Sequence, residues 1–145
     1  MLNADTLILE SCSVAETEAV GRNLARNLIA GDAVFLYGDL GSGKSVLVRG
    51  IIHALPCGEN RTVPSPTFVY IRYHPTRPRV YHLDLYRLPM KFDPDDLGLD
   101  ELANSEGVTI VEWAERLEEG IFSNPTRVRM EILTASRRKI YIQKG

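Results

Sequence analysis

A phosphate-binding pattern, GxxxxGK[ST], is matched in full by the stretch Gly38-Asp39-Leu40-Gly41-Ser42-Gly43-Lys44-Ser45. Glycines let the backbone curl, so that successive N–H groups point inward at phosphate oxygens. We expect the Lys44 ammonium to reach the β- and γ-phosphates and the Ser45 hydroxyl to bind Mg²⁺. An apolar run typical of a buried strand precedes the loop at 33–37, and a helical pattern follows it at 45–55. The stretch therefore predicts a binding site for ATP or GTP that contacts the phosphates through residues 39–45.

Two carboxylates, Asp84 and Glu112, come at the ends of strand-like segments and are candidates to hold the metal. In an open α/β sheet, ligands sit outside the carboxyl ends of the strands, so both side chains could converge on Ser45. The pattern favours Glu112, because its segment VTIVE is uniformly apolar and predicts a buried strand. Asp84 lies on a more amphipathic segment, and a strand-end cap is its alternative. Both are predicted as metal-site residues, and which of them contacts Mg²⁺ directly stays open.

Three further residues lie near these candidates and have ordinary structural interpretations. Trp113, the one tryptophan, follows Glu112, and a lone tryptophan is more often part of a core than a nucleotide stacker. His82 lies two residues before Asp84 and is interpreted as a packing or surface residue. In VPSPTF (63–68), Thr67 could bind metal and γ-phosphate as switch threonines do. The pattern alone favours a proline-stiffened turn there.

The elements around these residues predict a mixed α/β fold. A capping-box spacing, Ser13 to Glu16, begins a helix that is expected to run to Ala30. The remaining expected elements are strands at 6–10, 33–37 and 108–112, helices at 45–55 and 96–104, and hairpins at 67–74/79–86 and 127–133/138–143. We expect one P-loop NTPase-like domain over 1–145, with a mixed central sheet, flanking helices and a C-terminal β-hairpin.

Composition is that of an ordinary globular protein. The chain has 145 residues, 44% of them hydrophobic and 25% charged, and a net charge of −2. No apolar run approaches the roughly 20 residues of a membrane helix, and the first residues lack the features of a signal peptide, so we expect a cytoplasmic protein without membrane contact. Cys12 and Cys57 are expected as unpaired thiols. The basic clusters at 72–79 and 136–139 are interpreted as solvated faces.

Several motifs in sequence order resemble the TsaE family of small bacterial ATPases, which are needed to make threonylcarbamoyladenosine in tRNA. They are GDLGSGKS followed by LVRG, then SPTF, YHLDLYRL, a GLDEL-like stretch, VEWAERL and a closing basic hairpin. HLDLYRL and VEW are more diagnostic than the phosphate-binding loop, because many families share that loop. The motifs span most of the chain.

The resemblance implies a role for residues at matching positions. Thr67 becomes a switch-like residue near the γ-phosphate, in place of the simple turn. Asp84 takes the Walker B position and Glu112 a metal-facing position beside it. Trp113 lies near the nucleotide, and Arg138 falls where the C-terminal hairpin approaches it.

Other carried-over positions concern details of the site. Thr17 lies in the first helix, whose start borders the base-binding side. Alanine stands at 114, after Trp113, where proline is common. Serine stands at 45 where threonine is usual, and the hydroxyl that binds metal is retained.

The resemblance also implies a function. It points to an accessory ATPase, weak alone and stimulated by partners, which docks on the TsaB–TsaD pair and resets it between tRNA turnovers. ATP is implied over GTP, and contact with tRNA is expected through the complex. A small-molecule or nucleoside kinase is the alternative. Such kinases use arginine-rich lids, whereas the segment between Asp84 and Glu112 is acidic.

Overall fold

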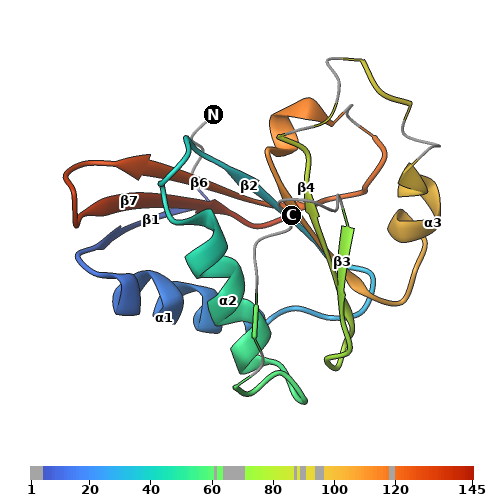
Figure 1. Cartoon of the computed structure of the whole chain (residues 1–145), viewed down its shortest axis with the longest axis horizontal. Coiled ribbons are helices and arrows are strands. Elements are labelled where there is room, and N and C mark those ends of the chain that lie inside the picture. Colours follow the sequence, from blue (N-terminus) through green and yellow to red (C-terminus); the bar gives the residue numbers. More distant parts are fainter. Residues whose placement is uncertain are drawn as a thin grey trace.

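The computed structural model of the chain describes residues 5–60, 62–63, 71–86, 88, 91–93, 97–117 and 120–145. These residues form a seven-stranded sheet with the order β1-β7-β6-β2-β5-β4-β3 (Figure 1). The strands are β1 (Thr6–Ser11), β2 (Ala33–Tyr37), β3 (Ile71–His74), β4 (Val80–Asp84), β5 (Val108–Glu112), β6 (Thr126–Ile132) and β7 (Arg138–Gln143). The helices are α1 (Val14–Ala25), α2 (Lys44–Ala54), α3 (Leu99–Ala103) and the 3-10 turn η2 (Ala114–Arg116). The predicted mixed α/β fold with flanking helices and a C-terminal hairpin is confirmed.

The centre of the sheet is parallel and its flanks are antiparallel. Strands β4, β5, β2 and β6 pair in parallel, whereas β3, β7 and β1 run antiparallel to their neighbours. The carboxyl ends of β2, β5 and β4 therefore meet at one edge. The register places Asp84 opposite Glu112, and Glu112 opposite Leu36 of β2. This edge is where the sequence predicts the metal site.

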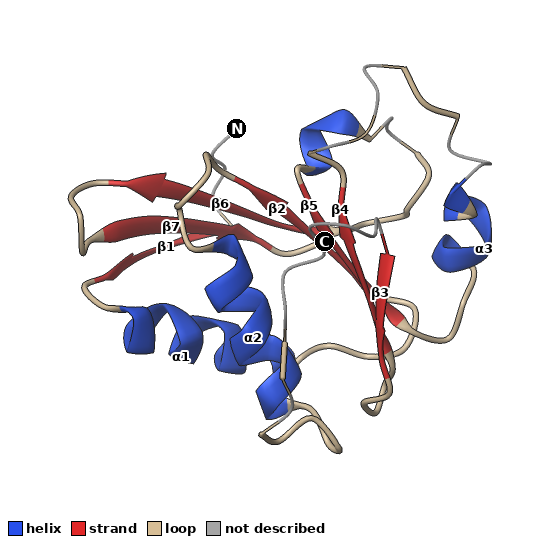
Figure 2. Ribbon diagram, in the orientation of Figure 1, coloured by secondary structure: helices blue, strands red, loops and turns tan. Residues whose placement is uncertain are grey.

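Side chains form two hydrophobic cores, one on each face of the sheet. Figure 2 shows α1 and α2 on one side of the sheet and α3 on the other. On one face, α1 and α2 cover apolar side chains of the central and C-terminal strands, among them Val34, Ile110 and Val128. On the other face, α3, η2 and the loop around Phe122 cover the opposite side of β2, β5 and β4. The side chains of β5 are all buried because both layers press on it. This burial explains why three of the four residues before Glu112, namely Val108, Ile110 and Val111, are apolar.

Helix α1 begins as predicted and ends earlier than predicted. The Ser13 side chain accepts a hydrogen bond from the Glu16 backbone N–H at 3.1 Å, and Glu16 Oε1 accepts one from the Cys12 N–H at 3.0 Å. The helix ends at Ala25 rather than continuing to Ala30. The next backbone bonds, including Leu28 N–H to the Ala25 carbonyl at 3.2 Å, span three residues and form turns. Leu28 still packs on the core, so its apolar character does not distinguish a turn from a helix.

Helices α1 and α2 approach closely through two glycines. A Cβ atom placed on Gly50 would lie 2.1 Å from the Glu18 carbonyl oxygen, and one on Gly21 would lie 2.1 Å from the Leu47 carbonyl oxygen. The Glu18 carboxylate, beside this crossing, accepts from Arg49 and His53, each at 3.3 Å. The missing side chains let α2 sit tightly against α1, which fixes where the N-terminus of α2 points.

None of the helices in the described parts of the chain is long and apolar enough to cross a bilayer. Cys12 and Cys57 are exposed free thiols, as the sequence predicts.

We expect Gly50→Ala to lower the free energy of unfolding by about 1–2 kcal/mol. Alanine gains about 1 kcal/mol of helix propensity over glycine, but its methyl group would press on a backbone oxygen that cannot rotate away. Urea denaturation measures the difference. Ala19→Leu, at an exposed position of α1, is the control that adds more atoms without a clash. A Gly50→Ala protein as stable as the parent would contradict the close packing of these helices.

Candidate functional site

The glycine-rich loop joins the end of β2 to the start of α2 in a conformation that needs its glycines. Gly38, Gly41 and Gly43 have φ angles of +149°, +80° and +102°. A Cβ atom on Gly38 would lie 2.7 Å from both the Met130 carbonyl oxygen and Ser42 Oγ. The loop is therefore packed tightly against β6. The Ser42 hydroxyl is buried and has no hydrogen-bond partner within the described residues.

Lys44 is the buried cation of the loop. Its Nζ donates to the carbonyl oxygens of Gly38 and, at 3.1 Å, Asp39. The same ammonium lies 4.5 Å from the centre of the Trp113 ring, which in turn packs on Tyr86. Burial lowers the pKa of Lys44, and the nearby Glu112 carboxylate opposes that shift. Trp113 is thus both a half-buried edge of the core and a direct neighbour of the predicted phosphate-binding lysine.

Glu112 and Ser45 lie together at the mouth of the loop. Ser45 Oγ donates to Glu112 Oε1 at 3.4 Å, across 67 residues of sequence. Glu112 is only 3% exposed, and its other oxygen, Oε2, lies 2.6 Å from His82 Nε2. Of the two candidate carboxylates, Glu112 is therefore the one that contacts the Ser45 hydroxyl in the described part of the chain.

Asp84 ends the neighbouring strand β4 and is half-buried. Its Oδ1 accepts a hydrogen bond from the Tyr86 backbone N–H at 2.9 Å. Burial raises the pKa of Asp84; the Tyr86 N–H opposes the shift, and the Glu112 carboxylate adds to it. The side chain thus has the strand-end bond of a cap and also belongs to the charged cluster formed with Glu112 and Lys44.

Arg138 connects the loop to the β6–β7 hairpin. Its Nε donates to the Ser42 carbonyl at 3.2 Å and its Nη2 to the Gly41 carbonyl at 3.0 Å. Nη1 donates to carbonyls of the hairpin turn, including that of Thr134 at 2.7 Å. The guanidinium therefore holds the outer part of the loop from the side, and only the resemblance to a family pointed to it beforehand. Leu40, a further predicted residue of the loop, is 62% exposed.

Two further positions, Thr67 and Thr17, are predicted from the sequence. Thr67 lies outside the described residues. Thr17 is buried, and its hydroxyl lies 2.7 Å from Ser11 Oγ. Its methyl carbon would lie 3.6 Å from a Cβ on Gly43, so Thr17 packs beneath the loop.

His82 contacts a predicted site residue, Glu112, and the sequence did not predict this contact. It is buried as a packing residue would be, at 1% exposure, but its imidazole bonds the Glu112 carboxylate. The signal was the spacing: His82 and Asp84 are two residues apart on β4, and β4 pairs in parallel with the strand that ends at Glu112. Only the strand register, which is a long-range property, converts that spacing into a contact.

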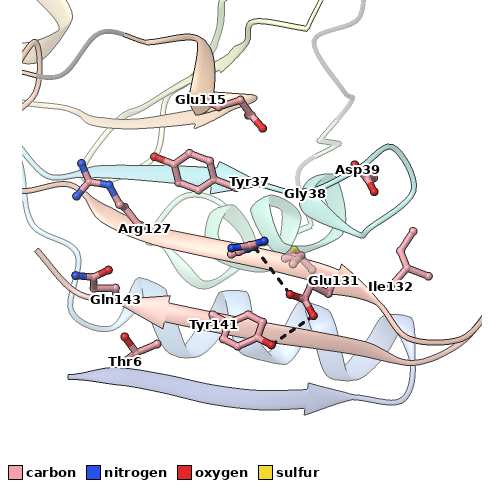
Figure 3. Close-up of a pocket in the computed structure, with 12 residues that line it drawn as sticks. Thr6, Tyr37, Gly38, Asp39, Glu115, Arg127, Glu131, Ile132, Tyr141 and Gln143 are labelled. Carbon is pink, nitrogen blue, oxygen red and sulfur yellow. Dashed lines mark hydrogen bonds and ion pairs between the residues drawn. The ribbon is translucent and has the colours of Figure 1, made fainter. Parts of the chain in front are cut away.

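A groove of about 850 Å³ lies on the open face of the sheet beside the loop (Figure 3). Side chains from four strands point into it, and Tyr141 bonds Glu131 at 3.3 Å. The lining residues are Thr6, Tyr37, Gly38, Asp39, Glu115, Arg127, Arg129, Met130, Glu131, Ile132, Tyr141 and Gln143. The groove shares Gly38 and Asp39 with the loop but contains neither Lys44 nor the two carboxylates. The groove therefore meets the predicted phosphate site at Asp39 and does not include its charged centre.

The donor atoms at the loop fit a magnesium triphosphate. Mg²⁺ prefers oxygen ligands and is usually held by one or two carboxylates together with substrate phosphates. Ser45 and Glu112 offer a hydroxyl and a carboxylate within 3.4 Å of each other, at the start of α2. No group of three His, Cys, Asp or Glu side chains that could hold a metal occurs in the described residues, among which Ser45 and Glu112 form a partial donor set. Such a partial donor set suits a metal that arrives with its nucleotide.

Comparison with known proteins gives one consistent family. The profile of "Threonylcarbamoyl adenosine biosynthesis protein TsaE" matches residues 11–140. The tRNA threonylcarbamoyladenosine biosynthesis protein TsaE of Streptomyces coelicolor is 42% identical over 116 residues, which are 77% of this chain and 76% of that protein. The protein of the same name from Rickettsia bellii is 35% identical over 139 residues, 95% of this chain and 93% of its own. The crystal structure of Bacillus subtilis YdiB is similar with a TM-score of 0.81 and 28% identity, covering 99% of this chain and 88% of that one.

We expect Asp84→Asn to raise the melting temperature at neutral pH. A raised pKa means that the folded protein favours the protonated carboxyl, so the fold loses stability as the pH rises through that pKa. The advantage of the asparagine variant should shrink as the pH falls through the raised pKa and vanish below the ordinary value of 3.8.

Thermal unfolding of the parent and the variant across this pH range measures the effect. Asp100→Asn, which changes an exposed carboxylate of α3, is the control and should show no comparable gain. A melting temperature of Asp84→Asn below that of the parent at pH 7 would contradict the burial of charge at this position.

Proposed function

This chain belongs to the TsaE family of tRNA threonylcarbamoyladenosine biosynthesis proteins, and from this membership we propose that it is an accessory, magnesium-dependent ATPase of that pathway. The observation that carries the proposal is the Ser45–Glu112 contact of 3.4 Å at the start of α2, beside the buried Lys44. A hydroxyl, a carboxylate and an ammonium of this kind, placed around a glycine-rich loop, are the parts that P-loop proteins use to hold a nucleotide triphosphate.

In this proposal, the loop binds the phosphates of ATP. The backbone N–H groups of residues 39–45 and the positive end of α2 face the phosphate oxygens. Lys44 exchanges its bonds with the Gly38 and Asp39 carbonyls for the β- and γ-phosphates. Arg138 keeps the loop in shape by holding the carbonyls of Gly41 and Ser42.

Ser45 and Glu112 hold Mg²⁺ in the proposal, and Asp84 lies beside them. The metal supplies positive charge that neutralises the phosphate oxygens during hydrolysis. Lys44 adds a second positive charge, and Trp113 covers its side chain from the edge of the core. The role of Thr67 as a γ-phosphate switch stays a prediction from the sequence.

The proposed partner is the TsaB–TsaD pair, on which the chain would dock with ATP bound and which hydrolysis would reset. The guanidinium of Arg138 donates to carbonyls of the loop and of the hairpin, so this arginine is already engaged in holding the loop. That arrangement supports a site that receives a catalytic arginine from a partner. P-loop ATPases and GTPases often gain a catalytic arginine from a partner, which is worth roughly 10³–10⁵-fold in kcat. We further propose a cytoplasmic location and contact with tRNA only through the complex.

We expect slow Mg²⁺-dependent ATP hydrolysis by the purified protein and a rate roughly tenfold or more higher with the TsaB–TsaD pair of its organism, because the pair completes the site. Phosphate release measures both rates, and Lys44→Ala in the same mixture is the blank. Equal rates with and without the pair would contradict the partner role. Phosphate transfer to nucleosides faster than hydrolysis would instead identify a kinase.

We expect Arg138→Ala to weaken ATP binding about tenfold. Hydrogen bonds from a charged group contribute about 1.5–3 kcal/mol, and about 1.4 kcal/mol corresponds to tenfold in affinity. Calorimetric titration with MgATP measures the change. Arg137→Ala is the matched control, because Arg137 is the adjacent arginine and pairs with Glu10 at 2.6 Å, away from the loop. If both variants bind ATP as the parent does, the Arg138 clamp does not support the nucleotide site.

A further inference from the structure

The imidazole of His82 is bonded to a carboxylate that the proposed function places at the metal. His82 Nε2 lies 2.6 Å from Glu112 Oε2, and both side chains are almost fully buried, at 1% and 4% exposure. Nδ1 of the same ring is buried without a hydrogen-bond partner among the described residues. Carboxylates accept hydrogen bonds, so Nε2 is the donor in this pair. Among the described residues, the hydrogen bond to Glu112 is therefore the one that the His82 ring makes.

The two oxygens of the Glu112 carboxylate contact two different elements. Oε2 faces His82 of β4, while Oε1 faces the Ser45 hydroxyl of α2 at 3.4 Å. A carboxylate held by one oxygen has little freedom to rotate, so its second oxygen is fixed toward Ser45. Metal sites in proteins commonly use such an outer partner to orient a ligand, and its loss typically weakens metal binding roughly 10- to 100-fold.

The surrounding charges explain why Glu112 needs this partner. The Lys44 ammonium and the Glu112 carboxylate are neighbouring groups of opposite charge. Without His82, a direct ion pair between Glu112 and Lys44 would be the best remaining way to satisfy a buried carboxylate. Such a pair would engage the lysine that must bind phosphate and turn Glu112 away from Ser45. His82 thus keeps the two charges available for separate ligands.

We propose that His82 is a positioning residue that presents Glu112 to the magnesium of the bound nucleotide. The proposal rests on the proposed function, since it needs a metal at Ser45 and Glu112. If this proposal is right, His82 contributes to nucleotide affinity in the presence of magnesium. It does not contribute to the affinity that the loop provides when magnesium is absent.

The test uses the full-length protein and a fluorescent N-methylanthraniloyl ATP, with dissociation constants measured in saturating MgCl₂ and in excess EDTA. The ratio of the two constants gives the magnesium enhancement. We expect His82→Leu to reduce this enhancement roughly tenfold or more and to leave the constant in EDTA within about twofold of the parent. His82→Gln, which keeps an N–H donor at a similar distance from the backbone, should restore most of the enhancement. Leu83→Ala, a fully buried change on the same strand, is the control for general destabilisation and should keep the enhancement.

A double-mutant cycle with Glu112→Gln separates positioning from a merely structural role. In the Glu112→Gln background, His82→Leu should cause no further loss of magnesium enhancement, because the carboxylate it orients is gone. Additive losses would overturn the proposal, as would a parent-like enhancement in His82→Leu. If His82→Leu does not fold, His82→Asn decides, because its shorter amide does not reach Glu112: a reduced enhancement that His82→Gln restores supports the proposal, and a parent-like enhancement in His82→Asn overturns it. Absence of any magnesium enhancement in the parent, or full enhancement in Glu112→Gln alone, would instead overturn the metal assignment in the proposed function.

Discussion

The burial of the Glu112 carboxylate at the mouth of the glycine-rich loop is the constraint on which the arrangement of the site depends. A buried charge is unfavourable by several kcal/mol unless partners surround it. Here a donor comes from each side, His82 from β4 and Ser45 from α2, while Lys44 supplies opposite charge nearby. These partners come from elements far apart in the sequence, so the sheet order and the helix packing must both be correct for the carboxylate to be satisfied.

The fold meets this requirement in two ways. Parallel pairing of β2, β5 and β4 brings the glycine-rich loop, Glu112 and Asp84 to one edge of the sheet. The glycine contact between α1 and α2 then fixes the direction of α2, whose first turn carries Lys44 and Ser45. Burial at this edge, to which the neighbouring Glu112 carboxylate adds, raises the pKa of Asp84. Stability is therefore given up where the proposed chemistry needs carboxylates.

Local sequence patterns were enough to predict the loop, the buried strand before Glu112 and the C-terminal hairpin, because each depends on neighbouring residues. The predicted end of α1 is wrong because Leu28 packs on the core from a turn as well as it would from a helix. The contact of His82 with Glu112 and the bonds of Arg138 to the loop depend on strand register and side-chain direction, which no local pattern encodes. The expectation of one domain over the whole chain and the switch role of Thr67 stay predictions.

The most direct measurement is a crystal structure of the protein with Mg²⁺ and a non-hydrolysable ATP analogue. We expect phosphates along residues 39–45, the Lys44 ammonium on the phosphates instead of on the Gly38 carbonyl, and the metal between Ser45 and Glu112. A nucleotide seated in the groove formed by Tyr37, Arg129 and Tyr141, with Lys44 still on its own loop, would contradict this expectation.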